Sequence, residues 1–390
     1  MLITAAQIHN GLEFLPAGST IVVGDDGTIE SILTSPTADT VHYDGILAPG
    51  FVNAHCHLEL SHTRGLIPEH TGLIEFLKNI SLRRNEFTAE QKESARINAH
   101  TELINNGIVA VGDIANTTDT LQLRSQGQLH FHTFVEALGF NEANAARSFG
   151  FAENTYSAFA QQESDHKVLK QTITPHAPYS VSAALFKAIS SHREDSLLSI
   201  HNQEGTAESD FYKYKEGGVR ELLKALGIDD TPFTPTGKSS LQSYLEWLTY
   251  ERPYIFVHNT YTDQVDVQFV KSRIKQAYWC LCPNANLYIE NKLPDIDMLV
   301  AEGVSLCIGT DSLASNHQLN ILSELHTLKL HYPSIAWETL LRWATHNGAH
   351  ALQMQDMVGS IKVGMKPGIV QLKNLEHPEI KPSVIPISFT

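Results

Sequence analysis

The sequence predicts an α/β protein, a (β/α)8 TIM-type barrel with a small β-sandwich domain formed by both chain ends. Two observations support the barrel: eight short β-branched or apolar segments recur along the chain, and helical stretches separate them. Alternation of this kind implies parallel strands joined by helical crossovers, and eight units in about 310 residues fit a closed barrel. An open doubly wound sheet is the alternative fold.

The expected strands are residues 51–54, 108–113, 129–136, 168–174, 196–201, 254–258, 277–282 and 304–309. The stretch 88–106 has the signals of a helix, because Thr88 and Gln91 have capping-box spacing. The segment 205–240 is longer than a barrel connection requires, and we expect it to form a helical excursion over one barrel face. Residues 50–358 together are expected to form a metal-dependent catalytic barrel.

The two chain ends differ from this central region, since they contain short strands separated by turn residues. Strands are expected at 20–23 and 28–33, and an apolar run at 369–372 follows a Gly- and Pro-rich stretch. We therefore expect residues 1–49 and 359–390 to pair into one composite small β domain.

The composition indicates where the protein is located and which partners it is not expected to bind. Lys plus Arg number 28 and Asp plus Glu number 43, so the formal charge is 28 − 43 = −15, which disfavours nucleic acid and anionic membranes as partners. No segment approaches the roughly 18 consecutive apolar residues of a membrane helix, and the start lacks a secretory signal. The 4 cysteines include no C-x-x-C pair. These features predict a cytoplasmic protein, and its 20 histidines direct attention to metal binding.

Polar residues of the kind that bind metals follow several expected strands. The first strand runs into His55 and His57, which share one strand face, the fifth into His201, and the eighth into Asp311. Because the C-terminal strand ends of a barrel converge on one face, these residues are expected to meet there. Three imidazoles and a carboxylate suit one divalent metal ion, with Zn²⁺ favoured and Fe²⁺ as the alternative. Each residue alone could be a core histidine or a helix cap, but their shared placement favours a site.

Further residues near these strand ends are candidates for catalysis. His258 ends the sixth strand, His176 follows the fourth, and Glu204 lies three residues after His201. A bound Zn²⁺ lowers the pKa of its water from ~15.7 to ~7, and a nearby carboxylate can then move protons between this water and the substrate. An ordinary solvated glutamate is the alternative interpretation of Glu204.

At these residues the sequence resembles the amidohydrolase superfamily, in its branch of deaminases and chlorohydrolases. The matching segments are residues 49–57, 174–179, 201–204, 282–286, 309–313 and 344–349, which read PGFVNAHCH, TPHAPY, HNQE, CPNAN, GTDSL and ATHNGA. The likeness spans almost the whole chain, and the motifs are specific as a set. It implies that His55, His57, His201 and Asp311 hold one divalent metal.

The resemblance also implies roles in the reaction. Glu204 would carry a proton to a ring nitrogen, His258 would orient the attacking water, and Asp311 would take a proton from this water and deliver it to the departing amine. Binuclear relatives carry a bridging carbamylated lysine at the end of the fourth strand. Here Lys170 lies too early in that strand, so one metal is expected.

The substrate implied by the resemblance is an adenine-type nucleoside, because the likeness includes S-adenosylhomocysteine, methylthioadenosine and aminodeoxyfutalosine deaminases. His176 would touch the nucleoside, Glu75 would hold the ribose hydroxyls, and Arg147 would meet a distal carboxylate. Glu75 and Arg147 could instead be ordinary solvated side chains. The stretch 57–61, HLELS, resembles the aminodeoxyfutalosine deaminases most.

Three functions therefore stay open. The first is metal-dependent hydrolytic deamination of an adenine-type nucleoside with release of ammonia. The second is another leaving group or ring, as in guanine deaminases or triazine-type chlorohydrolases. The third is a noncatalytic binding protein whose metal is structural. For the two enzymes the expected partner is a small heterocyclic substrate, and only the family resemblance suggests a homodimer.

Overall fold

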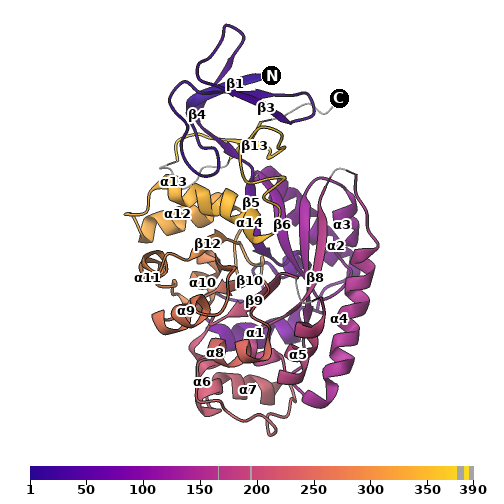
Figure 1. Ribbon diagram of the computed structural model, residues 1–390. Helices are drawn as coiled ribbons and strands as arrows, with labels where there is room; N and C mark the ends of the chain where they lie inside the picture. The colour runs from indigo at the N-terminus through magenta and orange to yellow at the C-terminus, as the bar shows by residue number, and fades with distance from the viewer. Residues whose placement is uncertain (166, 194–195, 376–381, 386–390) are drawn as a thin grey trace.

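A computed structural model describes the chain over residues 1–390, apart from residues 166, 194–195, 376–381 and 386–390. Two parts of different character are visible along its length. A larger part contains parallel strands and most of the helices, and a smaller sheet containing both chain ends lies at one end of it (Figure 1).

Eight parallel strands form the centre of the larger part, in two four-stranded sheets. They are β5 (Phe51–Cys56), β6 (Ile108–Ala115), β7 (His130–Ala137), β8 (Leu169–Pro175), β9 (Leu198–Asn202), β10 (Tyr254–His258), β11 (Ala277–Leu281) and β12 (Ser305–Ile308). One sheet has the order β5-β6-β7-β8 and the other the order β12-β11-β10-β9. All eight segments expected from the sequence are strands, and the fold is α/β with parallel sheets.

The two sheets meet at both edges. Between β5 and β12, the amides of Thr310 and Asp311 donate to the carbonyl of His55 over 3.1 and 3.0 Å. Between β8 and β9, the amide of Ser199 donates to Thr174 Oγ1 over 2.9 Å. Because all strands of each sheet are parallel and the two sheets are joined in this way, the C-terminal strand ends gather on one face.

Helices follow most of the strands. The α-helices are α1 (Leu73–Arg83), α2 (Ala89–Asn105), α3 (Leu121–Ser125), α4 (Ala145–Ala160), α5 (Ala183–Ser191), α6 (Thr206–Tyr214), α7 (Gly218–Ala225), α8 (Ser240–Tyr244), α9 (Gln264–Lys271), α10 (Pro283–Glu290), α11 (Ile296–Ala301), α12 (Ile321–His331), α13 (Trp337–Arg342) and α14 (Gly348–Ala351). Short 3₁₀ turns are η1 (Leu58–Thr63), η2 (Glu142–Asn144), η3 (Pro178–Ser180) and η4 (Leu245–Trp247), and η5 (Trp343–Asn347) is a π-helical turn. In the described part of the chain, no helix is both long and apolar enough to cross a membrane.

The start of α2 confirms its predicted capping box. Gln91 N donates to Thr88 Oγ1 over 3.3 Å, and Thr88 N donates to Gln91 Oε1 over 2.9 Å. These two hydrogen bonds provide acceptors for the backbone amides of Thr88 and Gln91, which have no partner within the helix. Cys280 and Cys282 are fully buried, and neither forms a disulfide.

Both chain ends join one sheet, as the sequence predicts. Its order is β14-β13-β4-β1-β2-β3, made of β1 (Leu2–Ile8), β2 (Thr20–Val23), β3 (Ile29–Leu33), β4 (Val41–Pro49), β13 (Ile369–Leu372) and β14 (Ser383–Val384). β13 pairs antiparallel with β4, with Ile369 opposite Pro49. The described residues of the two ends form this single sheet rather than the two facing sheets of a sandwich, so the expectation is met only in part.

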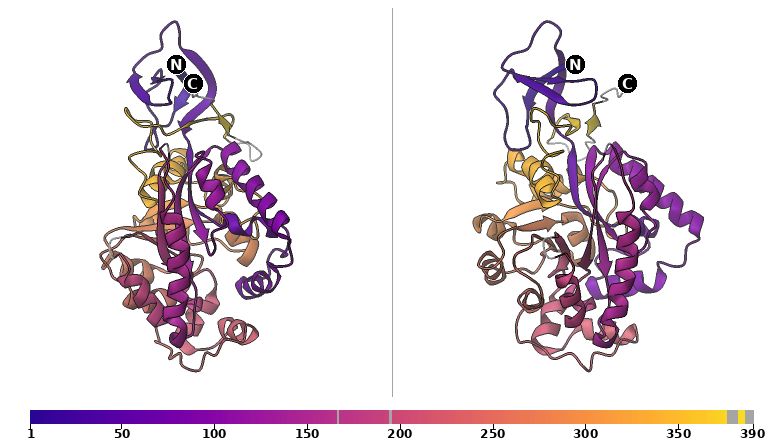
Figure 2. Two further views of the ribbon diagram at one scale, coloured as in Figure 1. Left: turned by 90° about the vertical axis from the view of Figure 1, so that its right-hand side faces the viewer. Right: turned by 45° about the vertical axis from the view of Figure 1, so that its right-hand side comes forward.

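The long segment after β9 is helical, as expected. Residues 205–240 contain α6 and α7, and these helices lie at the end of the molecule opposite the six-stranded sheet (Figures 1 and 2). α6 packs against α8, and α7 packs against α1. The excursion therefore covers part of the face on which the C-terminal strand ends gather.

Gly112 shows how closely the neighbouring strands β5 and β6 pack. A methyl group on Gly112 of β6 would lie 2.4 Å from the carbonyl oxygen of Ala54 and 3.0 Å from Leu352 Cδ2. We predict that Gly112→Ala lowers the free energy of unfolding by about 1–3 kcal/mol, because the backbones must separate. The measurement is urea unfolding followed by circular dichroism.

Gly150→Ala is the matched control, because it lies inside α4 with open space around the added methyl group. Alanine favours a helix over glycine by about 1 kcal/mol, so this variant should be as stable as the parent or more stable. Equal stability of Gly112→Ala and the parent would show that the two strands do not pack as described.

Candidate metal and active site

Four of the expected site residues come together where the parallel strands end. His55 lies near the C-terminal end of β5, and His201 and His258 lie at the C-terminal ends of β9 and β10. Asp311 follows β12. Their ligand atoms lie within 4.8 Å of one another. His57, just beyond β5, joins them: its Nε2 lies 3.1 Å from Nε2 of His55 and 3.1 Å from Nε2 of His201.

The ring nitrogens of this cluster are arranged to share a cation. Burial lowers the pKa of His57 to about 3, and it also lowers the pKa values of His55 and His201, so these rings are neutral at pH 7. The Nδ1–H group of His201 donates to the carbonyl of His176 over 2.8 Å, which leaves the Nε2 lone pair directed at the cluster. The Nε2 atoms of His55, His57 and His201 are thus spaced about as far apart as the ligand atoms of one metal ion.

The carboxylate of Asp311 completes the set. Its Oδ1 lies 3.3 Å from His57 Nε2 and 3.5 Å from His55 Nε2. Burial opposes its ionisation, but the hydrogen bond from His55 and the neighbouring histidines outweigh burial and hold the pKa of Asp311 well below its usual range. Ligand atoms around a tetrahedral Zn²⁺ lie about 3.3 Å apart, given Zn–N distances of about 2.0–2.1 Å. The distances and the donor types therefore both fit a divalent metal.

The backbone at the cluster is held in unusual conformations. Asp311 has φ 58° and His258 has φ 72°, in the left-handed region that non-glycine residues rarely occupy. Two hydrogen bonds hold Asp311 in place. Its backbone amide donates to the His55 carbonyl, and Ser315 Oγ donates to its Oδ2. His258 is fixed through its Nδ1, 3.2 Å from Asn286 Oδ1. Strain of this kind persists where surrounding contacts determine the conformation, and it is common at functional sites.

Glu204 lies beside the cluster as a buried carboxyl group. Its Oε1 is 3.7 Å from His258 Nε2, and its amide donates to Glu208 Oε1 over 2.7 Å. Burial, together with the charges of Asp311 and Glu290, raises the pKa of Glu204 well above its usual value. Burial thus favours the protonated form of Glu204, which can donate a proton.

Glu136 at the end of β7 is a site residue that the sequence interpretation missed. Its Oε1 lies 3.4 Å from His201 Nδ1, and its Oε2 accepts from Asn116 Nδ2 over 2.9 Å. Burial raises the pKa of Glu136 to about 8. The signal was available, because the expected strand 129–136 ends on this charged residue, just as the fifth expected strand ends on His201.

Glu59 supports Glu136 from the neighbouring loop. Its carboxylate accepts from the amides of Asn116 and Thr117, each over 2.9 Å, and from Thr117 Oγ1 over 2.7 Å. Asn116 in turn donates to Glu136. The turn after β5, the segment after β6 and the end of β7 are thereby joined by hydrogen bonds, and Glu136 brings this chain within 3.4 Å of His201 Nδ1.

His176 lies next to the cluster, as its predicted substrate contact requires. Its ring centre is 4.8 Å from that of His201, and its Nδ1 is 2.6 Å from Ser180 Oγ. Lys170 lies far from the cluster along the same strand and donates to the carbonyl of Gln353 over 2.6 Å. This placement agrees with a site that lacks a bridging lysine.

Two predicted substrate contacts are not brought to the cluster. Glu75 on α1 is 54 % exposed at its side chain and pairs with Lys78 over 3.2 Å. It lines a cavity of about 260 Å³ together with Gly205, next to the loop that carries Glu204. Arg147 is exposed on α4, where its guanidinium lies over the ring of Phe151 at 5.5 Å. The pairing with Lys78 and the stacking on Phe151 explain why these side chains turn away.

The contact between Glu136 and His201 leads to a prediction on metal affinity. Above its pKa of about 8 Glu136 is ionised and both of its oxygens face donors; in Glu136→Gln one of them becomes an NH₂ group that faces either Asn116 Nδ2 or His201 Nδ1. We predict that metal affinity falls about tenfold, the lower end of the usual effect of losing a partner of a metal-binding histidine. Competition with a chromophoric chelator measures this affinity.

Glu93→Gln is the control for this change, since Glu93 is exposed on α2. It should leave metal affinity unchanged. A Glu136→Gln protein that binds metal as tightly as the parent would mean that Glu136 does not support His201.

Comparisons with known proteins place the chain in a family. A model described as the amidohydrolase family matches residues 46–386. The chain is 26 % identical over 358 residues to an aminodeoxyfutalosine deaminase of a Nitratiruptor species, covering 89 % of this chain and 84 % of the relative. It is 25 % identical over 319 residues to an adenosine deaminase of Helicobacter pylori, covering 80 % and 76 %.

Solved structures of similar fold agree with this placement. A crystal structure of Helicobacter pylori aminofutalosine deaminase in complex with methylthio-coformycin matches with a TM-score of 0.78 and 22 % identity, covering 95 % of this chain and 92 % of that one. Guanine deaminase from C. acetobutylicum matches with a TM-score of 0.73 and 16 % identity, covering 95 % and 90 %. Since the family model spans most of its length, the chain belongs to the amidohydrolase family.

Proposed function

We propose that this chain is a metal-dependent hydrolytic deaminase that replaces the exocyclic amine of an adenine-type nucleoside with oxygen and releases ammonia. The observation that carries the proposal is the buried carboxyl of Glu204, whose Oε1 lies 3.7 Å from His258 Nε2 at the edge of the histidine and aspartate cluster. A structural metal site has no use for such a proton donor. The curated relatives named as deaminases of aminodeoxyfutalosine, adenosine and 5-methylthioadenosine/S-adenosylhomocysteine support the choice of an adenine ring.

The proposed ligands of one divalent ion are His55, His57, His201 and Asp311. Three imidazoles and a carboxylate suit Zn²⁺ best, and zinc is bound in the structure of an adenosine deaminase from Xanthomonas campestris that this chain resembles in fold. When bound, such an ion lowers the pKa of a water molecule to about 7. We further propose that residues 50–358 form a closed (β/α)8 barrel, and that residues 1–49 and 359–390 form a separate composite domain.

Glu204 and Asp311 each carry out a different proton transfer in the proposed reaction. Glu204 gives its proton to the ring nitrogen next to the carbon that bears the amine, which makes that carbon more electrophilic. The carboxylate of Asp311 accepts one proton of the attacking water and delivers it to the departing amine, and the second proton of that water restores Glu204 as the carbonyl forms. His258, fixed by Asn286, orients the water through its Nε2, and His176 contacts the nucleoside.

Glu204→Gln tests the proton transfer. The amide keeps the size of the side chain and its bond network, but it has no acidic proton to give. We predict a fall in kcat of about 10²–10⁴-fold, the usual contribution of a general acid, with metal content unchanged. Ammonia release and metal analysis of the same preparation measure both quantities.

Glu153→Gln, on the exposed surface of α4, serves as the control and should keep full activity. Full activity in Glu204→Gln would remove this residue from the mechanism. Loss of metal together with activity would instead give Glu204 a role in metal binding.

A panel of heterocycles tests the substrate class. We predict rapid ammonia release from one of adenosine, methylthioadenosine, S-adenosylhomocysteine and aminodeoxyfutalosine, and slow or no release from guanine and cytosine. Faster release from guanine, or chloride release from a chlorotriazine, would favour the second candidate, whose members share this fold. Silence across the panel with metal bound would reject the nucleoside deaminase.

A further inference from the structure

Two histidines outside the proposed active site lie one turn apart on a helix. His346 belongs to the π-helical turn η5, and His350 belongs to α14, which continues the same helix. Their ring centres are 4.3 Å apart, with an angle of 51° between the ring planes. Residues four apart on a helix share one face, and two histidines at this spacing can hold one metal ion.

The histidine pair lies at the opposite end of the strands from the proposed active site. Gly348, between the two histidines, packs against the start of β5, since a methyl group added to Gly348 would lie 2.9 Å from Val52 Cβ. His55 lies near the other end of this strand. The segment that follows the pair leads to the six-stranded sheet, where Ile361 N donates to the carbonyl of Asn10 over 2.8 Å. The pair is thus separate from the cluster proposed for catalysis.

Both rings are available to bind an ion from solvent. They are half-buried, and His346 Nδ1 lies 3.2 Å from Ser360 Oγ. The ring nitrogens of His350 make no hydrogen bond to any residue that the structure describes. Burial lowers the pKa of His346 to about 4, with smaller contributions from His350 and Arg342, and burial also lowers the pKa of His350. Both imidazoles are therefore neutral at pH 7, which is the form that binds metals.

One acidic and one basic group act on the pair. Burial lowers the pKa of His350, but the exposed carboxylate of Asp356 opposes this shift, so a negative charge favours a cation at this ring. The charge of Arg342 acts on His346 in the other direction. Arg342 has an acidic partner of its own, because its Nη2 lies 3.9 Å from Glu338 Oε1. The charges around the two rings therefore permit a cation to bind.

The separation of the two rings indicates which ion fits. An ion that holds two imidazole nitrogens at about 2.0–2.1 Å places the ring centres roughly 5.2 Å apart at a tetrahedral angle and roughly 4.5 Å apart at a right angle. The ring centres of His55, His57 and His201 are 4.8, 4.9 and 5.2 Å apart, near the tetrahedral value. The 4.3 Å between His346 and His350 is near the value for a right angle. Right angles are typical of the tetragonal coordination of Cu²⁺ and Ni²⁺.

We propose that His346 and His350 form a second metal site, which binds one divalent ion of tetragonal preference, Cu²⁺ or Ni²⁺, with water in the remaining positions. The π-helical turn at His346 agrees with this proposal, because such turns are frequent at functional sites. In barrel folds the C-terminal strand ends carry catalysis, whereas the N-terminal ends contribute to stability. An ion at this site therefore stabilises the helix formed by η5 and α14 and takes no part in the reaction.

Copper binding to the zinc-loaded protein tests this site. After dialysis against Cu²⁺ buffered with glycine, we expect one bound Cu²⁺ per chain, zinc retained, and an electron paramagnetic resonance spectrum with two nitrogen ligands. His350→Gln removes one ligand, so it should weaken copper binding about tenfold, a loss of about 1.4 kcal/mol. His346→Gln should have the same effect. Both variants should keep the zinc content and the circular dichroism spectrum of the parent.

His331→Gln is the matched control, because His331 is an exposed histidine on another helix, α12. It should bind copper as the parent does. Equal copper affinity in His350→Gln and the parent would overturn the second site. Copper that enters only as zinc leaves would also overturn it, because the ion would then occupy the cluster proposed for catalysis. The measurement needs no substrate, so its outcome is independent of the proposed reaction.

Discussion

The site depends on the hydrogen bonds that join the first and last parallel strands. The carbonyl of His55 accepts from the amides of Thr310 and Asp311, so a histidine and an aspartate distant in sequence are fixed side by side. Gly309 permits this approach, since a methyl group there would lie 2.8 Å from His55 Cβ and 2.9 Å from the His55 carbonyl oxygen. Without these hydrogen bonds between β5 and the segment after β12, His55 and Asp311 would lie on two separate four-stranded sheets. Backbone hydrogen bonds between distant parts of the chain thus determine which side chains come together in the site.

Buried carboxyl groups surround the histidine cluster, and their pKa values are shifted in opposite directions. Asp311 is held ionised by the histidines, whereas burial raises the pKa values of Glu204 and Glu136. Burying a charge in a protein interior is costly unless it is paired, so a carboxyl group without a cationic neighbour keeps its proton. An acceptor and a donor of protons therefore lie within one small site at the same pH. This division is what acid–base catalysis at neutral pH requires.

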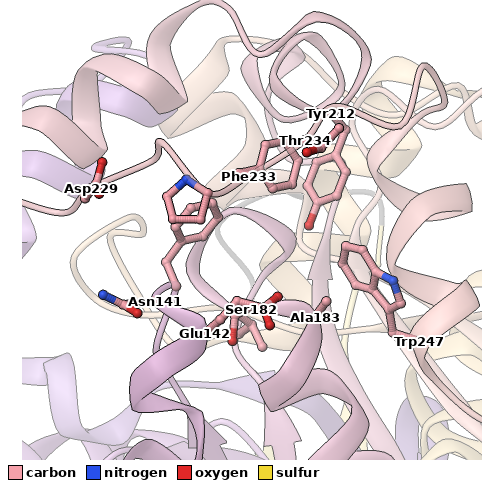
Figure 3. A pocket seen from close by; sticks show the side chains of 12 residues that line it. Asn141, Glu142, Ser182, Ala183, Tyr212, Asp229, Phe233, Thr234 and Trp247 are labelled. Carbon is pink, nitrogen blue, oxygen red and sulfur yellow. The ribbon is translucent and has the colours of Figure 1, made fainter.

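The region after β9 contributes to the reaction centre and to an aromatic pocket lined by Phe140, Tyr212, Phe233 and Trp247 (Figure 3). Glu208 at the start of α6 holds the amide of Glu204, and the end of the same helix supplies Tyr212 to the pocket. One short helix thus contributes both to the position of Glu204 and to the wall of this pocket. Relatives with the same fold but a different segment here could keep the reaction and change the substrate.

The sequence by itself determined the strands, the capped helix α2, the pairing of the chain ends and the types of metal ligand. These features follow from local periodicity and from residues at strand ends, which the topology of parallel strands brings together. Tertiary structure alone decided that Glu136 lies against His201, that Glu75 pairs with Lys78, and that Arg147 stacks on Phe151. The reason is that a side chain's direction depends on its rotamer and on neighbours distant in sequence. A local sequence pattern specifies neither the rotamer nor these distant neighbours. The contact between Phe140 and Phe233 illustrates the same limit, because residues so distant in sequence meet only once the segment 205–240 has folded.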